Sequence, residues 1–278
     1  MVPRAIKFSL MLRGLLSQSL VLNVIGIVGG FALWYGLVRW SPIQAFNRLP
    51  DPGQVITEWL SPNPTYGVSL FTQGYWAHVL YSTFRAYTAF GLALLLGLPL
   101  GILMGWKTVV RQYAQPLITL LRPVPPLAWV PIAILIMPTT EAAVIFVTFL
   151  VAFYATVMNT LVGVSSIPDD YFRAARSLGA NSRDVLWDVI VPGALPQIFT
   201  GLQIAMGAAW FSLVAGEMIA AQYGLGFLIW EAYNLIQYST IVIGMATLGA
   251  VGYLSSALVR WSGRRLMAWR HNRLGVTA

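Results

Sequence analysis

Six stretches of this chain are each long and apolar enough to cross a lipid bilayer, and no other feature limits the fold as strongly. A spanning helix needs about 20 mostly apolar residues. The six stretches are approximately 19–40, 76–106, 113–137, 141–164, 192–221 and 239–261. Hydrophobic residues make up 58% of the chain and charged residues only 9%, whereas about a quarter of the residues in soluble domains are charged. The sequence therefore predicts an all-α integral membrane protein with six transmembrane helices.

We expect one transmembrane domain, residues 19–261, with short segments before and after it. Residues 1–18 form either a helix on the membrane surface or an unstructured basic tail, and residues 262–278 form a second basic tail. An external segment, 41–75, follows the first span. A longer loop, 165–191, separates the fourth span from the fifth. Nothing after the first span resembles a signal-peptide cleavage site, so we interpret that span as a retained helix.

The basic residues are distributed unequally between the two sides of the membrane. Only Arg39 and Arg48 fall on the side that follows the first span. The opposite side carries Arg4, Lys7, Arg13, Lys107, Arg111, Arg173, Arg176, Arg183, Arg260, Arg264, Arg265, Arg270 and Arg273. Because cytoplasmic loops hold the excess of Lys and Arg, both termini are predicted to be cytoplasmic. This bias accounts for the net charge of +8 without a nucleic-acid partner.

The sequence offers no set of residues suited to catalysis or to binding a metal. It has no cysteine, and its two histidines, His78 and His271, lie far apart. The spans contain no Ser/His/Asp set, zinc motif or paired carboxylates, which disfavours an intramembrane enzyme. The phosphate-binding motif G-x4-G-K-[ST] is also missing, so an ATP-driven process would need a second chain to hydrolyse ATP.

The loop between the fourth and fifth spans reads YFRAARSLGANSRDVLWDVIVPGALP and carries signals for two short helices. Ser166 is expected to cap the first helix, and Gly179 to end it in the left-handed conformation. Asn181 or Ser182 is expected to cap the second helix, which Pro192 stops or kinks. A connection between helices needs only a few residues, so this hairpin predicts a docking surface. The alternative is that it packs beneath the helix bundle.

The same loop resembles the cytoplasmic loop of ABC importer permeases, whose motif is E-A-A-x3-G-x9-I-x-L-P. Ala174, Ala175, Gly179 and Pro192 keep the positions and spacing of that motif, whereas Arg173 stands in place of the Glu. In that family the loop forms a coupling helix that docks into a cleft of the ATPase subunit. We expect this segment to contact the ATPase through Arg173, Ala174, Ala175, Ser177, Leu178, Gly179 and Ala180. The contact that the motif Glu makes is not carried over to Arg173, because the charge is reversed.

Other segments are similar to the nitrate, sulfonate, taurine and bicarbonate branch of these permeases, with taurine and sulfonate permeases closest. The matching segments are LPDPGQV (49–55), LRPVPPLAWVP (121–131), GLQIA (201–205), AGEMI (215–219) and GLGF (224–227). The resemblance implies a type I importer fold in a bacterial inner membrane. It also implies a second permease copy, most simply in a homodimer, an external solute-binding protein, and two ATPase subunits that bind ATP and Mg. No cofactor is expected in this chain.

Apart from charges within two residues of a span end, three charged residues fall inside the spans: Arg85, Arg122 and Glu217. Such residues usually face the bundle interior or a water-filled cavity. Arg85 and Glu217 both lie toward the outer ends of their spans, so a salt bridge between them is one hypothesis. The alternative is that each pairs elsewhere or reaches toward the membrane surface.

Prolines disturb two of the predicted spans and place polar backbone inside the membrane. They are Pro123, Pro125, Pro126 and Pro131 in the third span, and Pro192 and Pro196 at the start of the fifth. Arg122 begins the first run, where it either binds the freed carbonyl groups or attracts an anion on its path through the membrane.

Met206, Trp210, Leu213 and Glu217 follow helical spacing and share one face of the fifth span. Together with Arg85 and Arg122, they are our candidates for the translocation path or gate. The predicted cargo is a small anion such as a sulfonate, taurine, nitrate or bicarbonate. The rival hypothesis is an ion-gradient-driven secondary transporter, for which only Glu217 offers an obvious intramembrane acid.

Overall fold

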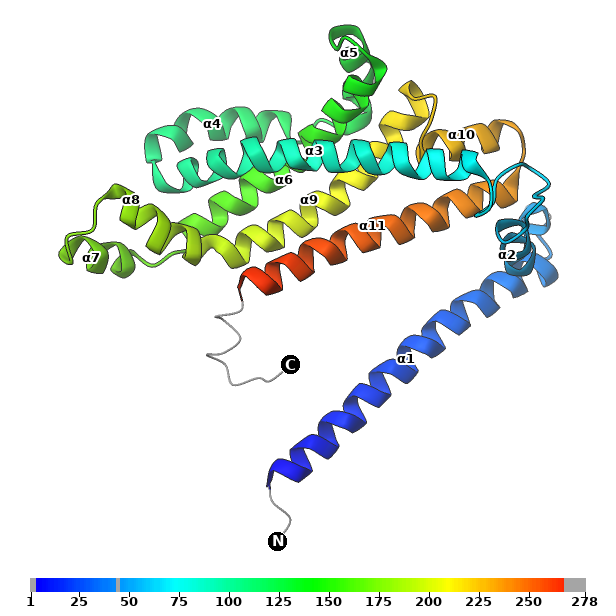
Figure 1. The fold of residues 1–278 in the computed structure, drawn as a ribbon, viewed down its shortest axis with the longest axis horizontal. Coiled ribbons are helices and arrows are strands. Elements are labelled where there is room, and N and C mark those ends of the chain that lie inside the picture. Colours follow the sequence, from blue (N-terminus) through cyan, green and yellow to red (C-terminus); the bar gives the residue numbers. More distant parts are fainter. Residues whose placement is uncertain (1–3, 44–45, 268–278) are drawn as a thin grey trace. The chain divides into compact units, whose positions relative to one another are not determined.

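The computed structural model describes residues 4–43 and 46–267, and in this part of the chain every regular element is helical (Figure 1). The chain divides into two compact units. One comprises the residues up to 72 together with 237–240, and the other comprises 73–236 and the residues from 241 onward. The first unit holds α1 (Arg4–Trp40), η1 (Phe46–Arg48) and α2 (Pro52–Trp59).

The second unit contains the remaining helices. They are α3 (Gln73–Trp106), α4 (Thr108–Leu121), α5 (Pro126–Ile136), α6 (Thr140–Ser165), α7 (Asp169–Ser177), α8 (Ser182–Asp184), the π-helical η2 (Val185–Ile190), α9 (Val191–Ala220), α10 (Leu225–Asn234) and most of α11 (Tyr238–Leu266). Figure 1 shows α7 and α8 at one end of this unit and α10 at the other.

Five helical stretches in the described residues are long and apolar enough to span a membrane. They are Val21–Trp40, Gln73–Trp106, Thr140–Ser165, Ser182–Ala220 and Tyr238–Leu266. These correspond to the first, second, fourth, fifth and sixth predicted spans. The number of crossings becomes six if the bent pair α4 and α5 is counted as one broken span.

The segment predicted as the third span, 113–137, is not a single helix. It consists of α4 and α5, which are bent by 102° relative to each other. The break lies at Pro123 and Pro125, which have no amide hydrogen to continue the helical ladder. Pro125 itself adopts an extended backbone, with φ −58° and ψ 141°, because Pro126 follows it and excludes the helical conformation.

In the first unit, α1 runs without interruption from Arg4 to Trp40. The side chains before Val21 lie outside the described residues, so the predicted contact of residues 1–18 with the membrane surface stays a prediction. The second short helix of this unit, α2, begins with a capping box: the Asp51 carboxylate accepts from the Gln54 amide at 2.8 Å, and the Gln54 side chain accepts from the Asp51 amide. The far end of the predicted basic tail, 268–278, also lies outside the described residues.

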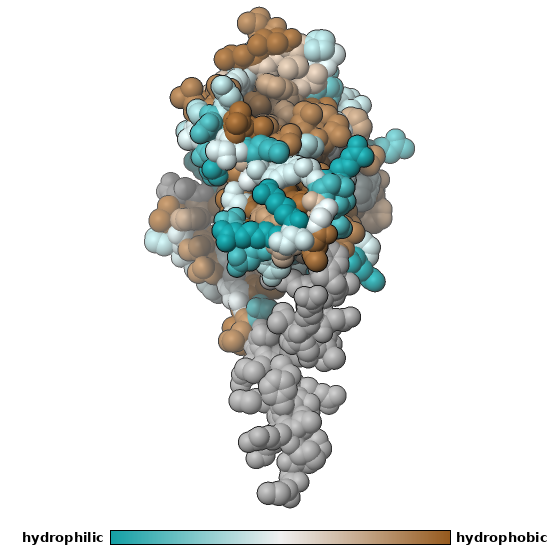
Figure 2. Space-filling model, turned by 90° about the vertical axis from the view of Figure 1, so that its left-hand side faces the viewer, coloured by the Kyte–Doolittle hydropathy of each residue, from teal (hydrophilic) through white to brown (hydrophobic). Residues whose placement is uncertain are grey.

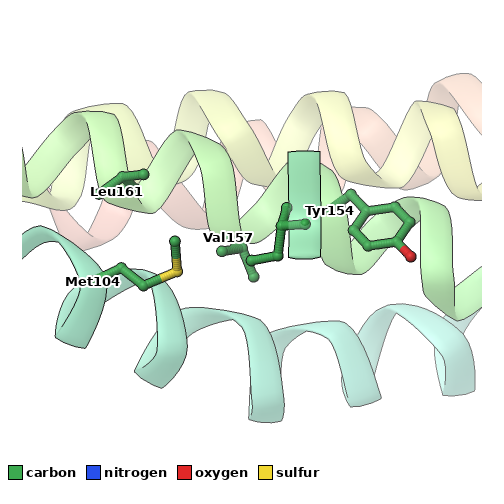
Figure 3. Close-up of a cluster of buried hydrophobic side chains, with 5 residues drawn as sticks. Met104, Tyr154, Val157 and Leu161 are labelled. Atoms are coloured by element: carbon green, nitrogen blue, oxygen red, sulfur yellow. The ribbon is translucent and has the colours of Figure 1, made fainter. Parts of the chain in front are cut away.

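The core of the second unit forms where α6 packs against both α3 and α9. A cluster of buried apolar side chains fills the space between α3 and α6, including Met104, Tyr154, Val157 and Leu161 (Figure 3). The two helices come close because α3 presents glycine at every fourth position. A Cβ atom on Gly101 would lie only 2.6 Å from the Cβ of Thr160. Small residues that allow close backbone approach are typical of helix contacts in membranes.

The loop between α6 and α9 contains the predicted helix hairpin, with one correction to its capping. Gly179 has the predicted left-handed backbone, with φ +84°, and Asn181 forms a capping box with Asp184. The prediction that Ser166 caps α7 is wrong. Ser166 is the C-cap of α6, and its hydroxyl donates to the carbonyl of Gly163 at 2.8 Å, because α6 continues to Ser165.

Pro192 does not stop the second helix of the hairpin, which excludes the first of the two predicted outcomes, a stop or a kink. One helical stretch continues from Ser182 through η2 and α9 to Ala220. In an ordinary α-helix, the ring of Pro192 would clash with the carbonyl of the residue four positions before it. Here the preceding turn is widened into a π-helix, in which the amide of Val191 donates to the carbonyl of Leu186. We interpret the wider turn as the local change that admits the proline.

Candidate functional site

The guanidinium group of Arg85 lies at the centre of a buried ionic cluster in the second unit. Its Nη1 atom donates to Glu217 at 2.7 Å, and its Nε and Nη2 atoms donate to the two carboxylate oxygens of Glu141 at 2.6 and 2.5 Å. Nη1 also donates to the carbonyl of Tyr223 at 2.5 Å. The side chains of Arg85 and Glu217 are fully buried, whereas that of Glu141 is 47% exposed. The hypothesis of an Arg85–Glu217 salt bridge is confirmed.

Glu141 is the member of this cluster that sequence reasoning missed. As the first residue of the fourth predicted span, 141–164, it is expected at the external end of that span and not among the charges buried in the membrane. In the structure it occupies the first turn of α6, just after the Thr139 cap, where its carboxylate suits the helix N-terminus. The direction of the predicted spans could have revealed Glu141, because α6 begins on the same side of the membrane as α3, which carries Arg85.

Glu217 is satisfied by hydrogen bonds as well as by charge. The hydroxyl of Ser82 lies 2.8 Å from both carboxylate oxygens and donates to the carboxylate, and the amide of Gly226 donates to it at 2.9 Å. Ser82 in turn accepts from the amide of Leu225 at 2.7 Å. Ser82 belongs to α3, Glu217 to α9 and Leu225 to α10, so these hydrogen bonds join three helices. Arg85 joins α6 to the same cluster through its bonds to Glu141.

The turn between α9 and α10 is shaped so that its backbone reaches this cluster. Gly224 has φ +132°, a conformation that residues with a Cβ atom rarely adopt. The Nδ1 atom of His78 lies 3.0 Å from both the amide nitrogen and the carbonyl oxygen of Gly224. The ring of Tyr81 stacks on that of Tyr223, with 5.2 Å between the ring centroids. This arrangement fixes the connection between the two helices against α3.

The other residues predicted to line a path on α9 face the interior of the subunit. Met206, Trp210 and Leu213 are all buried, with exposed fractions of 0%, 4% and 0%. A Cβ atom on Gly252 of α11 would lie 3.7 Å from the indole of Trp210, so this face packs against neighbouring helices of the same chain. Its predicted role in a gate stays a prediction.

A cavity of about 460 Å³ lies on another side of α9 and includes Arg122 in its lining. Its wall is mostly apolar, with Ile204 of α9, Tyr154 and Asn159 of α6, and Trp129 of α5. Within the described residues, the buried Nε1 atom of Trp129 has no hydrogen-bond partner. In the same part of the chain, the Arg122 side chain makes no hydrogen bond to the carbonyls freed by the prolines. Arg122 therefore lines a cavity, and its predicted role on an anion path stays a prediction.

The first helix of the predicted docking loop is mostly exposed. No residue of α7 is buried, and the apolar side chain of Leu178, which follows it, is 89% exposed. The helix ends in a Schellman motif, in which Gly179 donates to the carbonyl of Arg176 and Ala180 donates to that of Ala175, both at 3.0 Å. Figure 2 views this end of the second unit and shows hydrophilic residues gathered there.

Comparison with known proteins agrees with these observations. The profile of the family described as "Binding-protein-dependent transport system inner membrane component" matches residues 97–268. The chain belongs to this family. It is 36% identical to the taurine transport system permease protein TauC of Escherichia coli (strain K12) over 91% of both chains, and 38% identical to the nitrate import permease protein NrtB of Leptolyngbya laminosa over 80% of both. A bicarbonate transport system permease protein, CmpB of Synechococcus elongatus, is 34% identical over 90% of both chains.

The fold is also found in a solved ABC transporter. A chain of the MetNI methionine ABC transporter, in an inward-facing conformation, superposes with a TM-score of 0.58 over 69% of this chain and 94% of that chain. The sequence identity is 19%, so this likeness concerns the fold alone. The predicted type I importer fold and the predicted permease family are therefore confirmed: this permease is a multi-pass membrane subunit of an ABC importer.

Proposed function

We propose that this permease subunit passes a small oxyanion-containing solute across the membrane. The observation that carries the proposal is the set of relatives named for taurine, nitrate and bicarbonate transport, which are 34–38% identical to it over most of both chains. These three solutes differ in size and charge but share a group of oxygen atoms that carries negative charge. The cavity with Arg122 and the unpartnered Trp129 indole supports the proposal, since both side chains offer hydrogen-bond donors.

We further infer that the loop with α7 docks onto a separate ATPase subunit, which binds ATP and Mg. This helix buries none of its side chains within the chain, although Tyr171 is apolar enough to gain from a partner and is 63% exposed. The side that carries α7 is then cytoplasmic, as the distribution of basic residues predicts. Two copies of the permease form the pore in this proposal, and an external binding protein delivers the solute.

The proposed function disfavours the gradient-driven alternative. That alternative depends on Glu217 as an intramembrane acid that exchanges protons or ions. In the structure, Glu217 is fully buried and is held by Arg85 and Ser82. A carboxylate with these partners suits a structural role, which holds the helices together, better than a site that must bind and release a proton or ion.

Purification of the tagged permease from its native membranes in mild detergent tests the docking proposal. We expect an ATPase subunit to be recovered in equal amount. The variant Arg173→Glu reverses a charge in the docking helix and is expected to lower this recovery and to uncouple ATP hydrolysis from uptake. Arg48→Glu reverses another exposed charge, in η1, and serves as the matched control. Recovery of the permease alone at several salt concentrations and in several detergents would contradict the proposal.

The cargo is tested separately, with the complete importer in proteoliposomes. Uptake of labelled taurine, nitrate and bicarbonate is measured with the binding protein that co-purifies, and each solute is used to compete with the others. We expect one of the three to be taken up in an ATP-dependent manner. Uptake that is insensitive to all three would remove the oxyanion proposal while leaving the permease assignment intact.

A further inference from the structure

A cationic hollow lies beside α7, away from the ionic cluster and from the cavity at Arg122. Its volume is about 470 Å³, and it is lined where α3 ends, α4 begins, α6 ends and α7 begins. Figure 1 shows these four helix ends at the same end of the second unit. The charged side chains in the lining are Lys107, Arg111, Arg173, Arg176 and Asp169. Four cations therefore face one carboxylate, and among the described residues none of the four forms a salt bridge.

Backbone groups add to the positive potential of this hollow. The first residues of α4 and of α7 belong to its lining or adjoin it, and the N-terminal amides of a helix carry partial positive charge. Neither N-cap supplies a side chain to these amides, since the caps are Lys107 and Pro168 and no side-chain hydrogen bond is formed at either. Two uncapped helix starts next to four cations make a strong site for an anion.

The hollow lies at the level where a membrane helix meets the phospholipid head groups. Trp106 is the last residue of the spanning helix α3, and tryptophan at the end of a span marks this interface. The amine of Lys107 lies 4.4 Å above the Trp106 ring, which places one of the cations at the same depth. The rest of the lining is partly apolar and includes Val164, Ile167 and Phe172.

We propose that this hollow binds the phosphate group of an anionic phospholipid from the adjoining leaflet. The cations and the free amides would receive the phosphate, and the apolar side chains would contact the glycerol and the beginning of the acyl chains. Basic pockets between membrane helices are suited to anionic head groups. A soluble phosphate would use the cations but would gain nothing from the apolar residues of the lining, which is why the lipid is the better fit.

The lipid would link the membrane to the docking helix. Two of the four cations, Arg173 and Arg176, belong to α7, whereas Lys107 and Arg111 belong to the connection between α3 and α4. A phosphate bound between them holds α7 against the bundle in spite of the like charges. The binding site itself does not depend on the proposed function, but its consequence, a lipid requirement for coupling to the ATPase, rests on it.

Native mass spectrometry of the detergent-purified full chain tests the binding. The chain is titrated with phosphatidylglycerol and with phosphatidylcholine of the same acyl composition. We expect selective retention of phosphatidylglycerol. We also expect an affinity about 30-fold lower in Lys107→Gln/Arg111→Gln, because each cation near an anionic surface raises the binding constant about five- to sixfold and the two factors multiply. Arg264→Gln/Arg265→Gln removes the same charge from the end of α11 and is expected to retain wild-type affinity.

A conservative variant guards against loss of folding. Lys107→Arg/Arg111→Lys keeps both charges and is expected to keep selective lipid binding, with the thermal midpoint of each variant measured in parallel. Equal retention of both lipids, or an equal loss of affinity in the α11 control, would overturn the proposal. Displacement of phosphatidylglycerol by millimolar inorganic phosphate would overturn it in favour of a soluble anion.

The outcome is separable from that of the proposed function. Selective lipid binding by a chain that recovers no ATPase would refute the docking proposal and leave the lipid site standing. Recovery of the ATPase by a chain without lipid selectivity would refute the lipid site and leave the docking proposal standing. If the lipid site and the docking proposal are both correct, ATP-dependent uptake in proteoliposomes should rise with the phosphatidylglycerol content. This dependence should be lost in Lys107→Gln/Arg111→Gln.

Discussion

Removal of the Arg85 side chain should destabilise this permease more than any other single truncation at the ionic cluster. In Arg85→Met the apolar volume is roughly kept, but Glu217 is left as a buried carboxylate without a cation. The hydrogen bonds from Ser82 and Gly226 remain and offset part of this loss. Breaking a buried ion pair by removing one partner typically costs about 3–5 kcal/mol, and we expect a value in this range.

The contribution of Glu141 to this loss should be small. Its side chain is 47% exposed, so water can replace the guanidinium as its partner, and exposed pairs contribute only about 0–1 kcal/mol. Glu141→Gln should therefore be nearly as stable as the wild type. The destabilisation in Arg85→Met should instead become much smaller when the buried charge of Glu217 is removed as well. Arg85→Met/Glu217→Gln should recover most of it, because the neutral amide still accepts from Ser82.

Thermal unfolding of the purified variants in one detergent measures these differences. A loss of 1 kcal/mol lowers the midpoint by about 2–4 °C in chains of comparable size, so Arg85→Met should unfold about 10 °C earlier than the wild type. The reasoning is refuted if Arg85→Met is as stable as Glu141→Gln. It is also refuted if the double variant is no more stable than Arg85→Met alone, because the unpaired charge would then not be the cause.

Two further predictions concern the backbone. Gly101→Ala should cost about 1–3 kcal/mol through overpacking, because its Cβ would lie 2.6 Å from that of Thr160. Gly91→Ala on the same helix, where the Cβ would meet nothing within 4 Å, should be neutral in the same thermal assay. Gly179→Ala forces a Cβ into φ +84°, at a cost of about 1–2 kcal/mol, and Asn181→Ala removes a cap worth about 1 kcal/mol. Both should speed proteolysis within the docking loop while leaving the thermal midpoint unchanged, and a lower midpoint would show that the loop is part of the cooperative core.

The features that could be predicted from the sequence are those set by local chemistry. The spans follow from the length of apolar stretches, and the positions of Gly179 and Asn181 follow from the backbone needs of helix ends. The Arg85–Glu217 pair could be inferred because a charge in the bilayer requires a partner, and few partners exist in so apolar a chain. Each of these predictions depends either on local sequence or, for the ion pair, on the scarcity of charged residues in the spans.

The features that could not be predicted depend on several segments at once. Glu141 joins the cluster only because α3 and α6 begin at the same depth, which residue spacing along one helix does not reveal. The bend of 102° between α4 and α5 depends on where the helices on both sides can pack, although the prolines mark its position. The residues around Pro192 predict a stop or a kink without deciding between them, and the π-turn before it lets the helix continue.

The continuous helix provides a path along which a displacement of the docking loop could be transmitted across the membrane. The helical stretch from Ser182 to Ala220 is 39 residues long, and it connects the docking loop to the buried clamp at Glu217. The clamp end is held to α3 and α6 by ionic bonds that are costly to break without water. The other end contains the π-helical turn η2, and such turns are among the recognised causes of bends in helices. We therefore expect a displacement of α7 to be absorbed or transmitted at η2, with α9 moving as a rigid body about its clamped end.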